Sequence, residues 1–218
     1  MKEKDVLFLY DEIGGGMEIP VIREELMPYL SQRRQGEFTI DDYNALPEEQ
    51  RVELIDGVIY DMAAPSTFHQ FASGEIRSCL NGYILEKDGE CIVIQDIDTR
   101  LEKNDKTILR PDISVVCDRK KLNKKGIFGA PDLVIEVLSP STRWIDIHKK
   151  REKYLAAGVR EYWMVDPERK QIVVYELENT NCPVIYPLEG KIPVGIFNGE
   201  CVIDFAKICG RIGFLDKE

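Results

Sequence analysis

The stretch DLVIEVLSPSTRWIDIHKKREKYLAAGVREYWMVDP, residues 132–167, carries the clearest structural pattern in the chain. A short apolar run over 133–138 leads into a helical pattern over 144–157, which stops at Gly158, and a second strand pattern follows over 160–165. The first run is apolar on both faces, which is typical of a strand covered on both sides. We therefore expect a strand–helix–strand unit in the middle of the fold.

The segments around this unit indicate a sheet with helices packed on it. The patterns predict short helices near 20–30 and 41–50, a hairpin over 52–62 that turns at Asp56-Gly57, a helix over 68–86, strands over 91–101, 108–117 and 172–177, and two or three short strands with a final helical turn after 182. We expect an α/β fold with a mixed β-sheet flanked by helices. Its parts would be an N-terminal extension (1–36), a core (37–180) and a β-rich tail packed on the core (181–218).

The composition is that of an ordinary globular protein. The chain has 218 residues, of which 44% are apolar and 31% charged, and this suits one domain with extensions. No stretch approaches the roughly 20 apolar residues of a membrane helix. The apolar run over 6–10 is too short for a signal peptide. We expect a soluble, cytoplasmic protein with no membrane partner.

The charge is unevenly distributed along the chain. The net charge is −10, which argues against a general nucleic-acid coat. Residues 119–153, however, hold ten basic and four acidic side chains, a local charge of +6 that leaves −16 for the remainder. This segment either faces a polyanion or forms a solvated loop and helix face.

The cysteines show no metal-binding spacing. None of the six lies in a C-x-x-C pair, and four stand in apolar, strand-like surroundings: Cys79, Cys91, Cys117, Cys182, Cys201 and Cys209 are the full set. With no secretion signal, we expect reduced core residues rather than disulfides or zinc ligands.

Two acidic residues stand where the apolar pattern does not favour a charge. Glu136 lies within the apolar run 133–138 and shares a strand face with Val134 and Leu138. A buried carboxylate costs several kcal/mol unless it is paired, protonated or bound to a cation. Asp112 opens the apolar run 113–117. Two such acids on neighbouring strands suit a hard divalent cation, while the alternatives are a buried ion pair for Glu136 and a turn or cap for Asp112.

The helix after Glu136 brings positive charge to the same region. At 100° per residue, Lys150 and Arg151 share one half of this helix, and Lys149 and Lys153 point away. Periodicity does not choose between Lys150 and Arg151. Lysine suits a role near a water or phosphate, since arginine is the poorer proton acceptor.

Four motifs together resemble a large bacterial restriction-endonuclease-like family, long catalogued as a domain of unknown function, within the PD-(D/E)XK nuclease superfamily. They are VELIDGVIYDM (52–62), RPDISVV (110–116), APDLVIEVLSPST (130–142) and KREKYLAAGVREYWMVDP (150–167), with His69 between the first two. The resemblance spans roughly residues 37–180. It implies a restriction-endonuclease-like fold.

The resemblance also implies a catalytic site. Asp112 and Glu136 match the family's acids and would hold Mg²⁺ or Mn²⁺ together with the backbone carbonyl of Val137. The lysine expected two positions after Glu136 is replaced by Leu138. In the family the lysine stands on the following helix, four residues before a tyrosine, which selects Lys150 ahead of Tyr154.

Further residues are accessory candidates. Glu53 and His69 match an upstream acid and a histidine of the family; the alternatives are a hairpin surface residue for Glu53 and a cap or core hydrogen bonder for His69. The loop between the two acidic strands would lie near the metal and contact DNA phosphates through Arg119, Lys120, Lys121, Lys124 and Lys125.

We therefore predict a divalent-metal-dependent endonuclease that hydrolyses DNA, with a homodimer as a possible assembly. The alternatives are a catalytically weak or inactive nuclease-fold module that binds nucleic acid or protein, which the acidic net charge favours, and an enzyme acting on another phosphorylated substrate.

Overall fold

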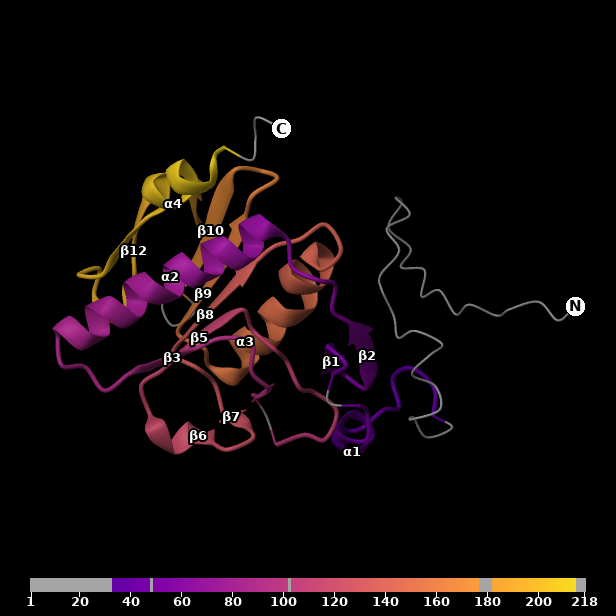
Figure 1. Ribbon diagram of the computed structural model, residues 1–218. Helices are drawn as coiled ribbons and strands as arrows, with labels where there is room; N and C mark the ends of the chain where they lie inside the picture. The colour runs from indigo at the N-terminus through magenta and orange to yellow at the C-terminus, as the bar shows by residue number, and fades with distance from the viewer. Residues whose placement is uncertain (1–32, 48, 102, 177–181, 215–218) are drawn as a thin grey trace, which may run out of the picture.

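The fold is the expected α/β arrangement of a mixed sheet and flanking helices (Figure 1). The computed structural model describes residues 33–47, 49–101, 103–176 and 182–214. The helix predicted near 20–30 and most of the N-terminal extension lie outside the described residues. Within them, no helix is long and apolar enough to cross a membrane.

The central sheet has six strands in the order β11-β10-β9-β8-β5-β3. Strands β8 and β9 pair in parallel, and a helix connects them along the chain. The predicted strand–helix–strand unit is therefore confirmed. The other neighbours in this sheet pair antiparallel. The bounds are β3 (Ile92–Ile94), β5 (Ile113–Val116), β8 (Leu133–Val137), β9 (Glu161–Asp166), β10 (Gln171–Glu176) and β11 (Val184–Pro187).

One face of the sheet is covered by α2 (Thr67–Glu86), with α4 (Phe205–Ile212) lying beside it (Figure 1). The apolar stripe of α2 comprises Ala72, Ile76, Leu80 and Ile84 and packs on alternate sheet residues. The tail adds β12 (Lys191–Pro193), η4 (Gly195–Phe197) and β13 (Val202–Asp204) to the same core. The described part of the tail therefore packs on the same core as α2.

The other face of the sheet is covered by a helix that changes its winding. It begins as the π-helix η3 (Ile145–Lys150), continues as α3 (Arg151–Ala157) and ends at Gly158, whose φ of 82° is left-handed. Tyr154 of α3 packs here against the sheet residue Tyr162. Glu136 points to this face, since it alternates with Ile135 of the α2 side.

A smaller unit adjoins the sheet. The predicted hairpin is present as β1 (Val52–Ile55) and β2 (Val58–Asp61), and its turn has φ of 52° at Asp56 and 77° at Gly57. It packs with the helix α1 (Ile40–Asn44) around a separate small core. The remaining short elements are β4 (Thr99–Arg100), η2 (Arg119–Lys121), β6 (Leu122–Asn123) and β7 (Gly126–Phe128).

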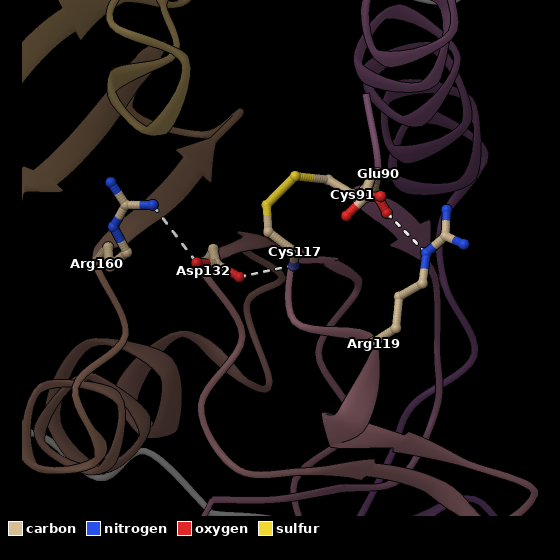
Figure 2. Close-up of a disulfide and its surroundings, with 6 residues drawn as sticks. All are labelled: Glu90, Cys91, Cys117, Arg119, Asp132 and Arg160. Carbon is tan, nitrogen blue, oxygen red and sulfur yellow. Dashed lines mark hydrogen bonds and ion pairs between the residues drawn. A yellow bond between two sulfur atoms is a disulfide. The ribbon is translucent and has the colours of Figure 1, made fainter. Parts of the chain in front are cut away.

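The expectation that all cysteines are reduced is wrong for one pair. Cys91 and Cys117 form a disulfide between the ends of β3 and β5 (Figure 2). These strands pair antiparallel with Ile92 opposite Val116, so the register places the two cysteines side by side. Residues directly opposite each other on neighbouring strands have Cβ atoms about 4.5–5.5 Å apart. The spacing of the cysteines along the chain does not show which strands pair, so it did not predict this disulfide.

Candidate active site

Asp112 and Glu136 meet at one end of the antiparallel pair β5–β8. The register sets Ile113 opposite Ile135, and one step further it sets Asp112 opposite Glu136. The backbone N–H of Asp112 donates to Oε2 of Glu136 over 3.2 Å, and that of Val137 donates to Oδ2 of Asp112 over 2.7 Å. The two carboxylates thus lie on one side of the sheet, next to Val137, whose backbone carbonyl is the third expected metal ligand.

Lys150 lies at the centre of a buried carboxylate cluster. Its side chain is 4% exposed. Its Nζ lies 2.9 Å from Oε2 of Glu53, 3.0 Å from Oδ1 of Asp146 and 3.2 Å from Oε1 of Glu136. An ammonium carries three N–H donors. Within the described part of the chain, its three donors therefore face three different carboxylates. The buried ion pair considered for Glu136 is present, and its partner is the candidate lysine.

The π-helical turn directs the side chains of Lys150 and Arg151 to different neighbours. The N–H of Arg151 bonds to the carbonyl of Asp146, five residues back, so the turn is wider than the 100° spacing assumes. Arg151 instead donates to the Tyr175 hydroxyl over 3.3 Å, and Lys149 lies over the Trp144 ring. Lys150 therefore points toward Glu136, whereas Arg151 points toward Tyr175.

Asp146 belongs to this site although the sequence reasoning overlooked it. It is 2% exposed and lies one turn before Lys150. The sequence did indicate this position by the four-residue spacing between Asp146 and Lys150, because an acid four residues before a lysine shares a helix face with it. The mixed charges of residues 143–153 concealed that signal.

Glu53 and Tyr154 complete the surroundings of Glu136 and Lys150. Glu53 comes from β1, is 4% exposed and accepts from the backbone N–H of Arg110 over 2.7 Å. The alternative of a surface residue on the hairpin is therefore wrong. The Tyr154 hydroxyl donates to Oε1 of Glu136 over 2.8 Å.

His69 holds the other acid from the start of α2. Its Nε2 lies 2.9 Å from Oδ2 of Asp112, while its backbone N–H bonds to the N-cap residue Ser66. Burial favours the neutral imidazole, but the hydrogen bond to Asp112 and its charge outweigh burial and raise the pKa of His69. The histidine is therefore a partner of Asp112 as well as part of the helix start.

Burial and crowded charges shift the site's acid–base equilibria. Burial raises the pKa of Glu136 well above its usual range, and Asp112 and Asp146 raise it further against the opposing effect of Lys150. Burial alone would lower the pKa of Lys150, but the surrounding carboxylates outweigh it and raise that pKa well above its usual range. The surrounding carboxylates therefore favour the ammonium form of Lys150.

A cavity of about 180 Å³ opens beside these residues. Its walls carry five carboxylates against three permanent cations: Glu53, Asp96, Asp112, Glu136 and Asp146 against Arg51, Arg110 and Lys150. The neighbouring carboxylates of Asp112 and Glu136 fit Mg²⁺, which binds through one or two carboxylates and keeps several waters. Within the described residues, no three His, Cys, Asp or Glu side chains form a closed metal cluster.

The basic loop is not where the sequence reasoning put it. Asp112 precedes β5 and the loop follows it, so a strand of about 3.3 Å per residue separates them. Arg119 donates instead to the carbonyl of Glu90, beside the disulfide (Figure 2). Residues 119–125, all of them described, do not line the cavity. The expectation that Arg119, Lys120, Lys121, Lys124 and Lys125 lie near the metal is wrong, because the loop joins the far ends of the two strands.

The fold and this site define a restriction-endonuclease-like protein, with paired acids at the strand ends and a lysine beside them. The chain belongs to the Uma2 family, described as "Putative restriction endonuclease", whose model matches residues 40–194.

Two further similarities agree with this membership. The uncharacterized protein slr1290 of Synechocystis sp. (strain ATCC 27184 / PCC 6803 / Kazusa) is 30% identical over 139 residues, which are 62% of this chain and 72% of that protein. A crystal structure titled as a putative nuclease belonging to DUF820, from Anabaena variabilis ATCC 29413, superposes with a TM-score of 0.65. It is 23% identical, and the match covers 78% of this chain and 97% of that one. The structural likeness supports the fold.

Proposed function

We propose that this protein is a divalent-metal-dependent endonuclease that hydrolyses DNA phosphodiester bonds. The observation that carries the proposal is the pairing of Asp112 and Glu136 at adjacent strand ends, with Lys150 buried against Glu136. Membership of a restriction-endonuclease family supports the same chemistry.

Asp112 and Glu136, with the carbonyl of Val137, would hold Mg²⁺ or Mn²⁺. When bound, the ion polarises the scissile phosphate and lowers the pKa of a bound water. His69 keeps the Asp112 carboxylate oriented through its 2.9 Å contact. Lys150 would act by holding the Glu136 carboxylate in place through its 3.2 Å contact.

The test is the cleavage of supercoiled DNA by purified protein with Mg²⁺, with Mn²⁺ or with EDTA. We expect cleavage with either metal and none with EDTA. Asp112→Asn should abolish cleavage. The matched control is Asp132→Asn, because Asp132 lies at the opposite end of β8, where it accepts from the N–H of Cys117. Cleavage by Asp112→Asn at the wild-type rate would contradict the proposal.

The rival is a nuclease-fold binding module with a weak or inactive site. The net charge of −10 favours it, because most of the surface repels a polyanion. DNA binding without cleavage under every metal condition would support the rival over the enzyme.

A further inference from the structure

The positive charge that meets a DNA phosphate in this cavity has to come from a residue other than Lys150. The Lys150 side chain is 4% exposed, and its three donors face Glu53, Asp146 and Glu136. To reach a phosphate, the ammonium would have to leave a buried carboxylate uncompensated, which is costly.

Arg51 is the more accessible cation on the cavity wall. Its side chain is 42% exposed, against 20% for Arg110. It stands two residues before Glu53, so in extended backbone the two side chains share a face, and both line the cavity. A guanidinium presents a planar fork of donors that matches a phosphate.

Arg51 is currently held by one carboxylate. Its terminal nitrogen NH1 lies 2.7 Å from Oδ2 of Asp96. Its Nε is buried and has no hydrogen-bond partner among the described residues. The guanidinium therefore keeps donors that an oxyanion could use once the side chain turns away from Asp96.

Asp96 has a second cation that would keep it compensated. Nε of Arg110 lies 3.3 Å from Oδ1 of Asp96, and NH2 of Arg110 donates to the Asp96 carbonyl over 3.2 Å. The backbone N–H of Asp96 donates to the carbonyl of Pro111, which anchors the turn at this position. If Arg51 turned to a phosphate, Asp96 would still face Arg110.

We propose that Arg51 and Asp96 form a masked phosphate-binding subsite on the cavity wall, in which a DNA phosphate displaces Asp96 from Arg51. This subsite rests on the proposed function, since it takes the substrate to be DNA. It assigns Arg51 the phosphate contact and Asp96 the role of a competing anion, which discourages other anions from occupying the site.

The test is binding of a short labelled DNA duplex, measured by fluorescence anisotropy across a salt series in Ca²⁺ and in EDTA. Arg51→Gln should weaken binding about tenfold, as expected for one lost charged contact. It should also lower the slope of log affinity against log salt by about one, whereas Arg51→Lys should keep the slope. Asp96→Asn should tighten binding because the competing carboxylate is gone.

Arg211→Gln is the matched control, because Arg211 is also an exposed arginine paired with a carboxylate, that of Glu75, but it stands on α4 and does not line the cavity. We expect it to leave the affinity and the slope unchanged. An Arg51→Gln protein with wild-type affinity and slope would overturn this inference while leaving the proposed function intact. Weaker binding by Asp96→Asn would overturn the competing role of Asp96. A wild-type protein that binds no DNA would overturn both proposals together.

Discussion

The ammonium group of Lys150 compensates three carboxylates that are all buried: Glu53, Glu136 and Asp146. Removing one partner of a buried ion pair costs about 3–5 kcal/mol, because an unpaired charge stays behind. The same group therefore contributes to the stability of the fold and, on the proposed function, to cleavage.

Lys150→Met is the residue-scale test, since methionine fills much of the lysine volume without its charge. We expect the free energy of unfolding in EDTA to fall by about 3–5 kcal/mol and cleavage to fall by about 10²–10⁴. Urea denaturation and a plasmid assay measure the two effects. Lys149→Ala and Arg151→Ala are the neighbouring controls, and loss of cleavage in Arg151→Ala alone would move the role by one residue.

Glu136 makes stability depend on pH in a defined direction. Its folded pKa lies above the ordinary glutamate value of 4.5, so the folded state binds the proton more tightly than the unfolded chain does. The free energy of unfolding should therefore decrease as the pH rises from 4.5 through the folded pKa. His69, whose pKa is also raised, contributes with the same sign at higher pH.

Glu136→Gln isolates this contribution, because the amide is a neutral group of the same size. In EDTA we expect the variant to unfold with a shallower pH dependence than wild type, and cleavage should be lost. Urea denaturation from mildly acidic to mildly alkaline pH gives the slopes. Equal slopes for the two proteins would mean that Glu136 titrates in the folded state as it does in the unfolded chain.

At the scale of elements, β5 separates two different local structures. Asp112 stands before the strand in the site, and Cys117 stands after it in the disulfide with Cys91. The far end is held further by Asp132, which accepts from the Cys117 N–H and pairs with Arg160 (Figure 2). Stability and chemistry at the two ends should be separable by experiment.

Cys91→Ser is expected to lower the free energy of unfolding by about 2–4 kcal/mol, since the disulfide closes a loop between residues 26 apart. Cleavage in Mg²⁺ should persist because the active site lies at the other end of β5. Denaturation with and without reductant measures the first effect and a plasmid assay the second. Cys182→Ser, at an exposed thiol, is the control, and a wild-type stability insensitive to reductant would contradict the expectation.

At the scale of the whole molecule, the described residues form one candidate site of this kind, and the net charge of the full chain is −10. A single site cuts one strand at a time, so a concerted cut of both strands calls for a second copy of the chain. The homodimer stays a prediction of the sequence.

The products formed from supercoiled DNA distinguish a single chain acting alone from a homodimer. If one chain acts alone, nicked circles should accumulate before linear DNA; if a dimer acts, linear DNA should appear without that lag. We expect the dimer's pattern, with a rate that rises more steeply than linearly with protein concentration. Light scattering on the same samples gives the molar mass of the protein. A monomer that yields linear DNA without nicked circles would contradict the link between a dimer and the cutting of both strands.

The sequence by itself determined the strand–helix–strand unit, the hairpin and the two acids, but not the short strands, since the strand expected over 91–101 is divided between two sheets. The apolar run around Glu136, the helix ended by Gly158 and the Asp56-Gly57 turn are local patterns, and local patterns report period and burial. The family motifs then singled out Lys150 ahead of Tyr154. These residues were predictable because each departs from, or completes, a pattern within a few positions of the chain.

Only the tertiary structure decided which residues from distant parts of the chain contact one another. It placed Glu53 and Asp146 on Lys150, joined Cys91 to Cys117, and moved the basic loop 119–125 to the far strand ends. The π-helical turn that directs Lys150 inward closes its hydrogen bond over five residues, whereas an α-helix closes each bond over four. Strand pairing and helix winding depend on contacts between distant segments, and therefore no local spacing in the sequence encodes them.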